Sequence, residues 1–297
     1  MTSQQPISFE RIADRLRPAS PRISPDGASV AVTVSYASEK EKRAASTIWM
    51  IRDSEEPFPF TGGLSGASEP DWSPDGTKLV FLSNRDDEDK KSGLFVIPVT
   101  GGEAQQLGEV RGDISQPRWA PDGTLIAYLM TDPETDEEKK RKEDEKRDQI
   151  LFEEEPKHRR LWVIDPKRGT SRCLTTGNRS VHDYTWAPDS RELVIVSIAM
   201  PTVTSLFCPS RVARVPVHGG LEREVVTFPM APDAPVVGEV NGERVIAMIG
   251  NDHRADPSPS IWTVPWDGGT RRNLLPELRG SVEGWLPTPQ TVVRSWR

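Results

Sequence analysis

Residues 23–27 read Ile23-Ser24-Pro25-Asp26-Gly27, and this motif returns along the chain. Its further copies are Trp72-Ser73-Pro74-Asp75-Gly76, Trp119-Ala120-Pro121-Asp122-Gly123, Trp186-Ala187-Pro188-Asp189-Ser190 and a weaker Met230-Ala231-Pro232-Asp233-Ala234. Proline presets φ in a tight turn, aspartate bonds the backbone two residues on, and glycine takes the positive φ that closes a hairpin. Each copy therefore predicts a corner between two strands, repeated at steps of 49, 47, 67 and 44 residues.

The same series of segments follows each corner. A run rich in Val, Leu and Ile comes first, as in Leu79–Ser83, and a second run with an aromatic residue near its start follows, as in Leu94–Ile97. A glycine-rich turn such as Thr100–Glu103 then leads into a last short run, as at Gln105–Leu107. Four short strands in a repeat of about 48 residues are typical of a propeller blade. The sequence therefore predicts an all-β protein, a β-propeller built of four-stranded antiparallel blades.

Tryptophan placement supports this interpretation. Six of the nine tryptophans fall at two fixed positions of the repeat, which predicts that they pack between successive blades. These six are Trp49, Trp72, Trp119, Trp162, Trp186 and Trp262.

The repeat divides the chain into an N-terminal lead-in, residues 1–20, and a propeller of WD-like or Tol-type repeats, residues 21–297. Five blades are recognisable, and Ser281–Pro287 with Thr291–Val293 reads as the first half of a sixth. A propeller closes by joining its last blade to its first, because an open edge leaves backbone groups unpaired. We therefore expect either that the lead-in completes a ring of five or six blades, or that the chain is truncated and forms the front part of something longer.

Charge and targeting signals exclude several classes of protein. Lys and Arg number 38 against 45 Asp and Glu, a formal net charge of −7, which argues against a nucleic-acid or anionic-membrane surface. Residues 1–18 lack the apolar core of a signal peptide, and no stretch approaches the ~18 apolar residues that a membrane span needs. Cys173 and Cys208 do not make a disulfide scaffold and are expected to be free structural thiols. We therefore expect a cytoplasmic protein with no nucleic-acid or membrane partner.

The long third repeat is explained by an insertion at residues 131–160, between its second and third strands. Of these 30 residues, 21 are Asp, Glu, Lys or Arg. Glu137 with Arg141 and Glu138 with Lys142 place the acid four residues before the base, the favoured order on a helix surface. The insertion is therefore expected to contain a charged helix. It is either a solvated projection or an element that meets a partner domain or gates an entry route.

Four residues of the insertion are candidates for substrate gating or partner contact: Glu153, Glu154, Glu155 and Arg159. The three consecutive carboxylates stand where the insertion returns to the blade. They are suited to hold a cationic group such as a free amino terminus.

Catalytic and cofactor motifs are absent from the sequence. It contains no G-x-S-x-G nucleophile elbow, H-E-x-x-H zinc motif, P-loop or dinucleotide fingerprint. Its four histidines are scattered without metal-ligand spacing. We therefore expect no metal, no cofactor and no catalytic residue in this chain.

Three passages resemble one family. The start from Arg17-Pro18 to Gly27, the W-S-P-D-G repeats, and the passage from Phe152-Glu153-Glu154 through Pro156-Lys157 to Leu161-Trp162-Val163-Ile164-Asp165 are similar to the N-terminal propeller of prolyl oligopeptidase-family serine peptidases. The similarity is to the acylaminoacyl peptidase and dipeptidyl aminopeptidase branch. The Tol-system propeller shares the blade motif, whereas the lead-in and the charged insertion favour the peptidase.

The resemblance implies a propeller that caps a catalytic α/β-hydrolase domain and restricts entry to short or N-acylated peptides. The hydrolase domain and part of the propeller have no counterpart in these 297 residues, so the chain alone is expected to be inactive. Its expected partners are a hydrolase domain and short peptides. Two alternatives remain open: a free-standing propeller that serves as a binding or scaffold module, and a periplasmic Tol-like propeller.

Overall fold

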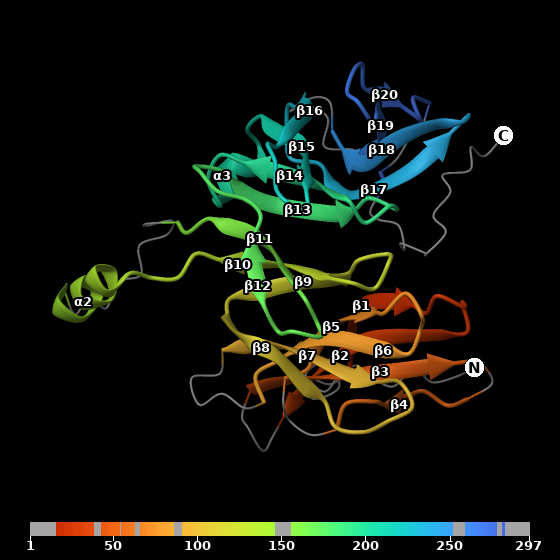
Figure 1. Ribbon diagram of the computed structural model, residues 1–297, viewed down its shortest axis with the longest axis vertical. Coiled ribbons are helices and arrows are strands. Elements are labelled where there is room, and N and C mark those ends of the chain that lie inside the picture. Colours follow the sequence, from red (N-terminus) through yellow and green to blue (C-terminus); the bar gives the residue numbers. More distant parts are fainter. Residues whose placement is uncertain are drawn as a thin grey trace, which may run out of the picture. The chain divides into compact units, whose positions relative to one another are not determined.

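A computed structural model describes most of the chain (Figure 1). The described residues are 16–38, 43–53, 55–62, 66–85, 91–145, 156–251, 259–277 and 281–282. They belong to two compact units, residues 1–119 and 120–297, and each unit is described by itself.

Strands form five antiparallel four-stranded sheets, each with its strands in sequence order, as expected for propeller blades. Blade 1 comprises β1 (Arg17–Ile23), β2 (Ser29–Ser38), β3 (Arg43–Arg52) and β4 (Phe58–Pro59); blade 2 comprises β5 (Ser68–Trp72), β6 (Lys78–Ser83), β7 (Ser92–Pro98) and β8 (Gln105–Gly112). Blade 3 comprises β9 (Ile114–Trp119), β10 (Ile126–Thr131), β11 (Arg159–Ile164) and β12 (Ser171–Cys173). Blade 4 comprises β13 (Ser180–Trp186), β14 (Glu192–Ile198), β15 (Ser210–Pro216) and β16 (Arg223–Phe228); blade 5 comprises β17 (Asp233–Val240), β18 (Glu243–Gly250), β19 (Ser260–Pro265) and β20 (Arg272–Asn273). The all-β propeller predicted from the repeat is confirmed. The partial sixth blade from residue 283 on and the lead-in up to residue 15 lie outside the described residues.

The S-P-D-G corners form as their residue types predict. In the first corner, Oδ1 of Asp26 accepts the Ser24 hydroxyl at 2.5 Å and the Ala28 N–H at 3.0 Å, and Gly27 has a φ of 75°. The Ser24 hydroxyl oxygen also accepts the N–H of Ser29, the first residue of β2, at 2.9 Å. These hydrogen bonds, first from Ser24 and then from Ala28, lower the pKa of Asp26. The hydrogen bonds that form the corner thus join residues of the motif to each other and to the two residues that follow it.

The fifth corner lies elsewhere than the sequence motif predicted. Asp233 and Ala234 belong to the start of β17, and the turn from β17 to β18 is Asn241-Gly242, with φ values of 52° and 82°. Two successive positive φ values match the type I′ hairpin, for which Asn-Gly is a preferred pair. The assignment of residues 230–234 to a corner was therefore wrong, because a different local turn chemistry closes this hairpin.

A second repeated feature explains the error. Each of four inner strands carries a residue of positive φ directly before a proline, and in blades 1, 2 and 5 this residue lies at a break in the pairing register. These residues are Ser20, Glu69, Gln116 and Ala234. Ala234-Pro235 is therefore the blade 5 counterpart of Glu69-Pro70, and the Pro-Asp pair at 232–233 belongs to the chain leading into it.

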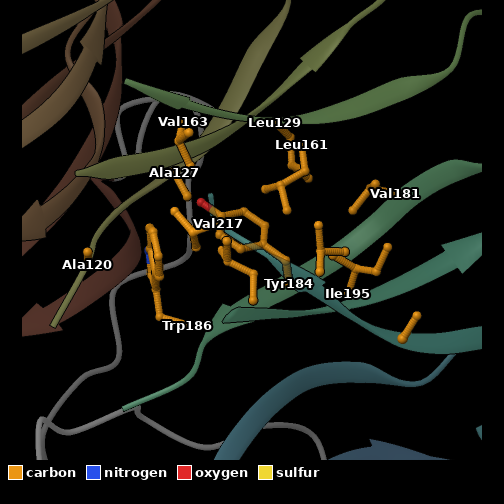
Figure 2. Packing of buried hydrophobic residues seen from close by; sticks show 13 residues of the cluster. Ala120, Ala127, Leu129, Leu161, Val163, Val181, Tyr184, Trp186, Ile195 and Val217 are labelled. Atoms are coloured by element: carbon orange, nitrogen blue, oxygen red, sulfur yellow. The ribbon is translucent and has the colours of Figure 1, made fainter. Parts of the chain in front are cut away.

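Apolar clusters join neighbouring blades within each unit. In the first unit, Ile48 and Met50 of β3 are buried together with Trp72 and Phe81 of blade 2. In the second unit, Tyr184 and Trp186 of β13 lie in one cluster with residues of β10, β11, β14 and β15 (Figure 2). Trp262 packs against a further cluster of blades 4 and 5. The predicted role of tryptophan between blades is confirmed at these positions.

Two short helices connect second and third strands of blades. The helix α2 (Asp136–Glu145) follows β10, and α3 (Val203–Leu206) follows β14. Figure 1 shows α2 standing clear of the strands that flank it. The charged helical insertion is therefore confirmed, while residues 146–155 lie outside the described part. Within the described residues, no helix has both the length and the apolarity that crossing a bilayer requires.

Candidate functional site

The end of the second unit opposite its hairpin corners is the candidate functional surface. We call it the insertion face, defined by the β10–β11, β14–β15 and β18–β19 connections. The corner end has short turns, whereas the insertion face carries connections 132–158 and 199–209, each with a helix. Connections of unequal length on a rigid scaffold are where binding residues concentrate.

The insertion leaves the blade through a neck that extends the β10–β11 ladder. The N–H of Asp132 donates to the carbonyl oxygen of His158 at 2.8 Å. The carboxylate of Asp132 accepts Nε of Arg160 at 2.9 Å and also pairs with its terminal nitrogen Nη2 at 2.9 Å. We define the neck as Asp132, Glu138, Lys157, His158 and Arg160, since these residues hold the outgoing and returning chains together.

Glu138 links the neck to the helix. It forms a capping box with Thr135: one carboxylate oxygen accepts the Thr135 N–H at 2.7 Å, and the Thr135 hydroxyl accepts the Glu138 N–H at 3.3 Å. Its other oxygen accepts the ammonium of Lys157. The Lys157 hydrogen bond and then the Thr135 N–H lower the pKa of Glu138 to about 2. The predicted partner, Lys142, has a side chain outside the described set.

Arg159 is the one predicted site residue that the structure describes. Its guanidinium Nε donates to the carbonyl of Val181 at 3.2 Å, and its Nη2 donates to the carbonyl of His182. The Arg159 N–H donates to the hydroxyl of Ser180 at 2.9 Å. Arg159 therefore joins β11 to the inner strand of the next blade. Glu153, Glu154 and Glu155 lie outside the described residues, so the gating and partner-contact roles of all four remain predictions.

A second pair of side chains joins blades 4 and 5 at the same face. Nε2 of His182 lies 2.7 Å from Oδ1 of Asp233. Next to it, Oδ2 of Asp183 accepts the N–H of Ala234 at 2.8 Å, and its Oδ1 accepts the N–H of Tyr184 at 2.8 Å. Sequence reasoning treated His182 as one of several scattered histidines. The sequence feature that could have pointed to this contact is the position of Asp183 and Asp233 near the starts of successive inner strands.

Similar side-chain contacts join successive blades in the first unit. The Thr33 hydroxyl accepts the Glu69 N–H at 3.0 Å, and the Glu69 carboxylate accepts the Gln116 N–H. Asp71 accepts the Trp119 N–H at 2.8 Å and lies 3.4 Å from Nε of Arg22. Burial raises the pKa of Asp71, and the Arg22 charge acts against that change. These inner-strand groups hold successive blades in register.

The β14–β15 connection presents apolar side chains to solvent. Val203 is 56% exposed, Phe207 54% and Met200 39%, and Thr202 caps the short helix α3 through Ser205. Large exposed apolar side chains gathered in one loop indicate a contact surface. The insertion face thus combines charged and apolar contact groups.

Two further features of the described residues concern metal binding and thiol chemistry. Among the residues that the structure covers, no group of three or more His, Cys, Asp and Glu is placed to hold a metal ion. Cys173 donates to the carbonyl of Thr175 at 3.1 Å, and burial raises the pKa of its thiol, which disfavours the nucleophilic thiolate. Of the groups described above, Arg159, Asp183, Glu69 and Asp71 bond to backbone groups of neighbouring blades, and Asp132 and Glu138 pair with Arg160 and Lys157 in the neck.

Comparison with known proteins gives one sequence relative and many structural ones. No family model matches the chain. It is 31% identical to an uncharacterized peptidase, YuxL, of Bacillus subtilis (strain 168) over 96 residues, which are 32% of this chain and 14% of that protein. The chain thus spans a small part of this relative's length.

Solved propellers share the fold at low sequence identity. The acylaminoacyl peptidase of Pyrococcus horikoshii matches with a TM-score of 0.64 and 16% identity, over 92% of this chain and 42% of that chain. The β-propeller domain of the trilobed protease from Pyrococcus furiosus, described as having an open velcro topology, matches at 0.59 and 16% identity over 93% and 76%. A putative TolB from Agrobacterium tumefaciens matches at 0.58 and 17% identity over 87% and 80%. The chain is a β-propeller whose structural neighbours include the propeller domains of acylaminoacyl peptidase and the trilobed protease, together with a TolB-like propeller.

Proposed function

We propose that this chain is the non-catalytic, substrate-gating propeller of a prolyl oligopeptidase-like serine peptidase that acts on short or N-acylated peptides. In this proposal an α/β-hydrolase domain outside these 297 residues supplies the catalytic triad. The propeller's insertion face, with Arg159 and the carboxylates Glu153, Glu154 and Glu155, meets that domain or the entering peptide.

The observation that carries the proposal is the sequence similarity to a peptidase. The 31% identity over 96 residues is with YuxL, and the acylaminoacyl peptidase match has a higher TM-score, 0.64, than the putative TolB match, 0.58. The sequence match favours the peptidase side, while the two structural matches, at 16% and 17% identity, support the fold that both classes share.

A fluorophosphonate probe tests which polypeptide carries the serine nucleophile. The purified chain is treated with the probe alone and after co-expression with an α/β-hydrolase domain encoded beside it. Label is expected on the hydrolase polypeptide and not on this chain, because the serine nucleophile belongs to the hydrolase. Specific label on the chain alone would show that it carries its own nucleophile and would overturn the non-catalytic role.

A free-standing propeller, including a Tol-like one, is the second candidate. The alignment that favours it covers 80% of the putative TolB, so that protein extends little beyond the matched region. The candidates differ in location: the peptidase proposal places the protein in the cytoplasm, whereas the Tol-like role requires the periplasm. Fractionation of the source cells with antibody against the chain distinguishes them, since recovery in the periplasmic fraction would favour the Tol-like role.

A further inference from the structure

His158 occupies a position in the neck that is unfavourable for a positive charge. Its carbonyl oxygen accepts the Asp132 N–H at 2.8 Å, which fixes its backbone at the base of the insertion. Its ring nitrogen Nδ1 is buried and has no hydrogen-bond partner among the residues described. A proton on this nitrogen would therefore be held away from water without an acceptor.

The charged groups around His158 are already paired with each other. Along the chain, Lys157 precedes it, and it is followed by Arg159, whose guanidinium donates to the Val181 and His182 carbonyls, and by Arg160. Facing it are Asp132 at the end of β10, which pairs with Arg160 at 2.9 Å, and Glu138 of α2, which accepts Lys157. A third positive charge would thus enter a neck whose two carboxylates each hold a cation.

The surroundings of His158 favour its neutral form. Burial and then the Arg160 charge lower the pKa of His158, with Asp132 acting in the opposite direction. A closed neck therefore prefers the neutral ring. Its stability is fully present above the ordinary histidine pKa and is lost as the pH falls through the lowered one. Glu138, whose pKa is about 2, remains ionised over this range, so the carboxylate of the cap does not contribute to the change.

We propose that the neck is an acid-sensitive joint, in which protonation of His158 loosens the contact between the chains that enter and leave the insertion and frees α2 from its anchored position. The joint changes how the insertion is presented on the insertion face. The opening itself is independent of the proposed peptidase role. Only its consequence, altered access to that face, rests on the proposed function.

Amide hydrogen exchange on the 297-residue chain tests the joint. Protection of peptides that cover residues 132–138 is measured at about pH 7.5 and about pH 5.5, each corrected for the intrinsic exchange rate at that pH. Protection is expected to fall several-fold at the lower pH, because burial and the Arg160 charge make the closed neck unfavourable for the protonated ring. Peptides from β14 in the blade core report whether the fold is intact.

Three variants identify the responsible group. His158→Gln cannot be protonated in this range, so its neck protection is expected to be equal at both pH values. His218→Gln, at an exposed position in the turn after β15, and His182→Gln, at the other histidine described on this face, are expected to retain the wild-type pH response. Equal neck protection of the wild-type chain at the two pH values would overturn the proposal, as would an undiminished response in His158→Gln.

Salt dependence gives a second test that needs no variant. Raising the salt to about 1 M shortens the screening length to ~3 Å and weakens repulsion between His158 and the neighbouring cations. The loss of neck protection at about pH 5.5 should therefore be smaller in high salt. A larger loss in high salt would contradict a repulsive contribution from the neighbouring cations, whereas the burial of the ring, the larger cause, is not screened by salt.

Discussion

Single carboxylates at the inner strands fix how blades follow one another. Asp183 accepts N–H groups from Tyr184 in its own strand and from Ala234 in the next blade, both at 2.8 Å. In the first unit, the Glu69 carboxylate accepts the N–H of Gln116 in the next blade. The Asp183 carboxylate satisfies the Ala234 N–H at a break in strand pairing, where the sheet itself offers no acceptor.

Replacing Asp183 by Asn tests this role. Asn keeps one acceptor oxygen and turns an amide toward the second N–H, so we expect unfolding free energy to fall by about 1–3 kcal/mol. The matched control is Glu55→Gln in the exposed pair with Arg52, 3.7 Å apart, where a surface ion pair contributes about 0–1 kcal/mol. Urea unfolding measures both variants. Equal losses in the two variants would refute the inter-blade role of Asp183.

At the scale of elements, corners were predictable and the ties between blades were not. The S-P-D-G corner is specified by hydrogen bonds among neighbours such as Ser24, Asp26 and Ala28, which can be inferred from the sequence. The fifth corner was misplaced because the turn from β17 to β18 is formed by Asn241-Gly242, which differs from the S-P-D-G motif. Ties such as Thr33 to Glu69 join residues 36 positions apart, and only the folded arrangement reveals them.

The Asn241-Gly242 hairpin gives a prediction for an element. Gly242 has a φ of 82°, so Gly242→Ala should lower the unfolding free energy by about 1–2 kcal/mol. Gly62→Ala is the control, because no atom lies within 4 Å of the added methyl and φ is outside the left-handed region. It should be neutral or stabilising by up to about 1 kcal/mol. Thermal or urea unfolding would contradict the corner assignment if Gly242→Ala were as stable as Gly62→Ala.

The helix α2 gives a second prediction at this scale. Glu138→Gln removes the charge that caps the helix and holds Lys157, so cleavage by trypsin after Lys139 and Lys140 should accelerate several-fold. The exposed Glu137→Gln is the control and should leave cleavage near the wild-type rate. Because the pKa of Glu138 is lowered from 4.5 to about 2, the wild-type cap is fully formed above about pH 4.5 and is lost as the pH falls through about 2. Helix content, followed by circular dichroism from neutral pH to about pH 2, would contradict this assignment if the acid transition of Glu138→Gln coincided with that of the wild-type chain, whereas the transition of Glu137→Gln is expected to match the wild type.

At the scale of the whole molecule, the repeat determined the fold and the site was only partly accessible from sequence. Five blades follow from local turn chemistry and a regular spacing. Arg159 was identified from sequence as a residue of the insertion, but its contacts with Val181 and His182 depend on the next blade. The neck likewise joins Asp132 and Glu138 to residues that follow the whole insertion, so its geometry required the structure.

Discrimination by peptide length tests the gating role most directly. The chain joined to the α/β-hydrolase domain that the proposed function requires, and that hydrolase domain alone, are compared by kcat/KM on N-acylated peptides of increasing length. The account predicts that the joined protein cleaves short peptides and loses activity steeply as the peptide lengthens, while the hydrolase alone shows a weaker dependence on length. The same length dependence with and without this propeller would contradict a role in gating.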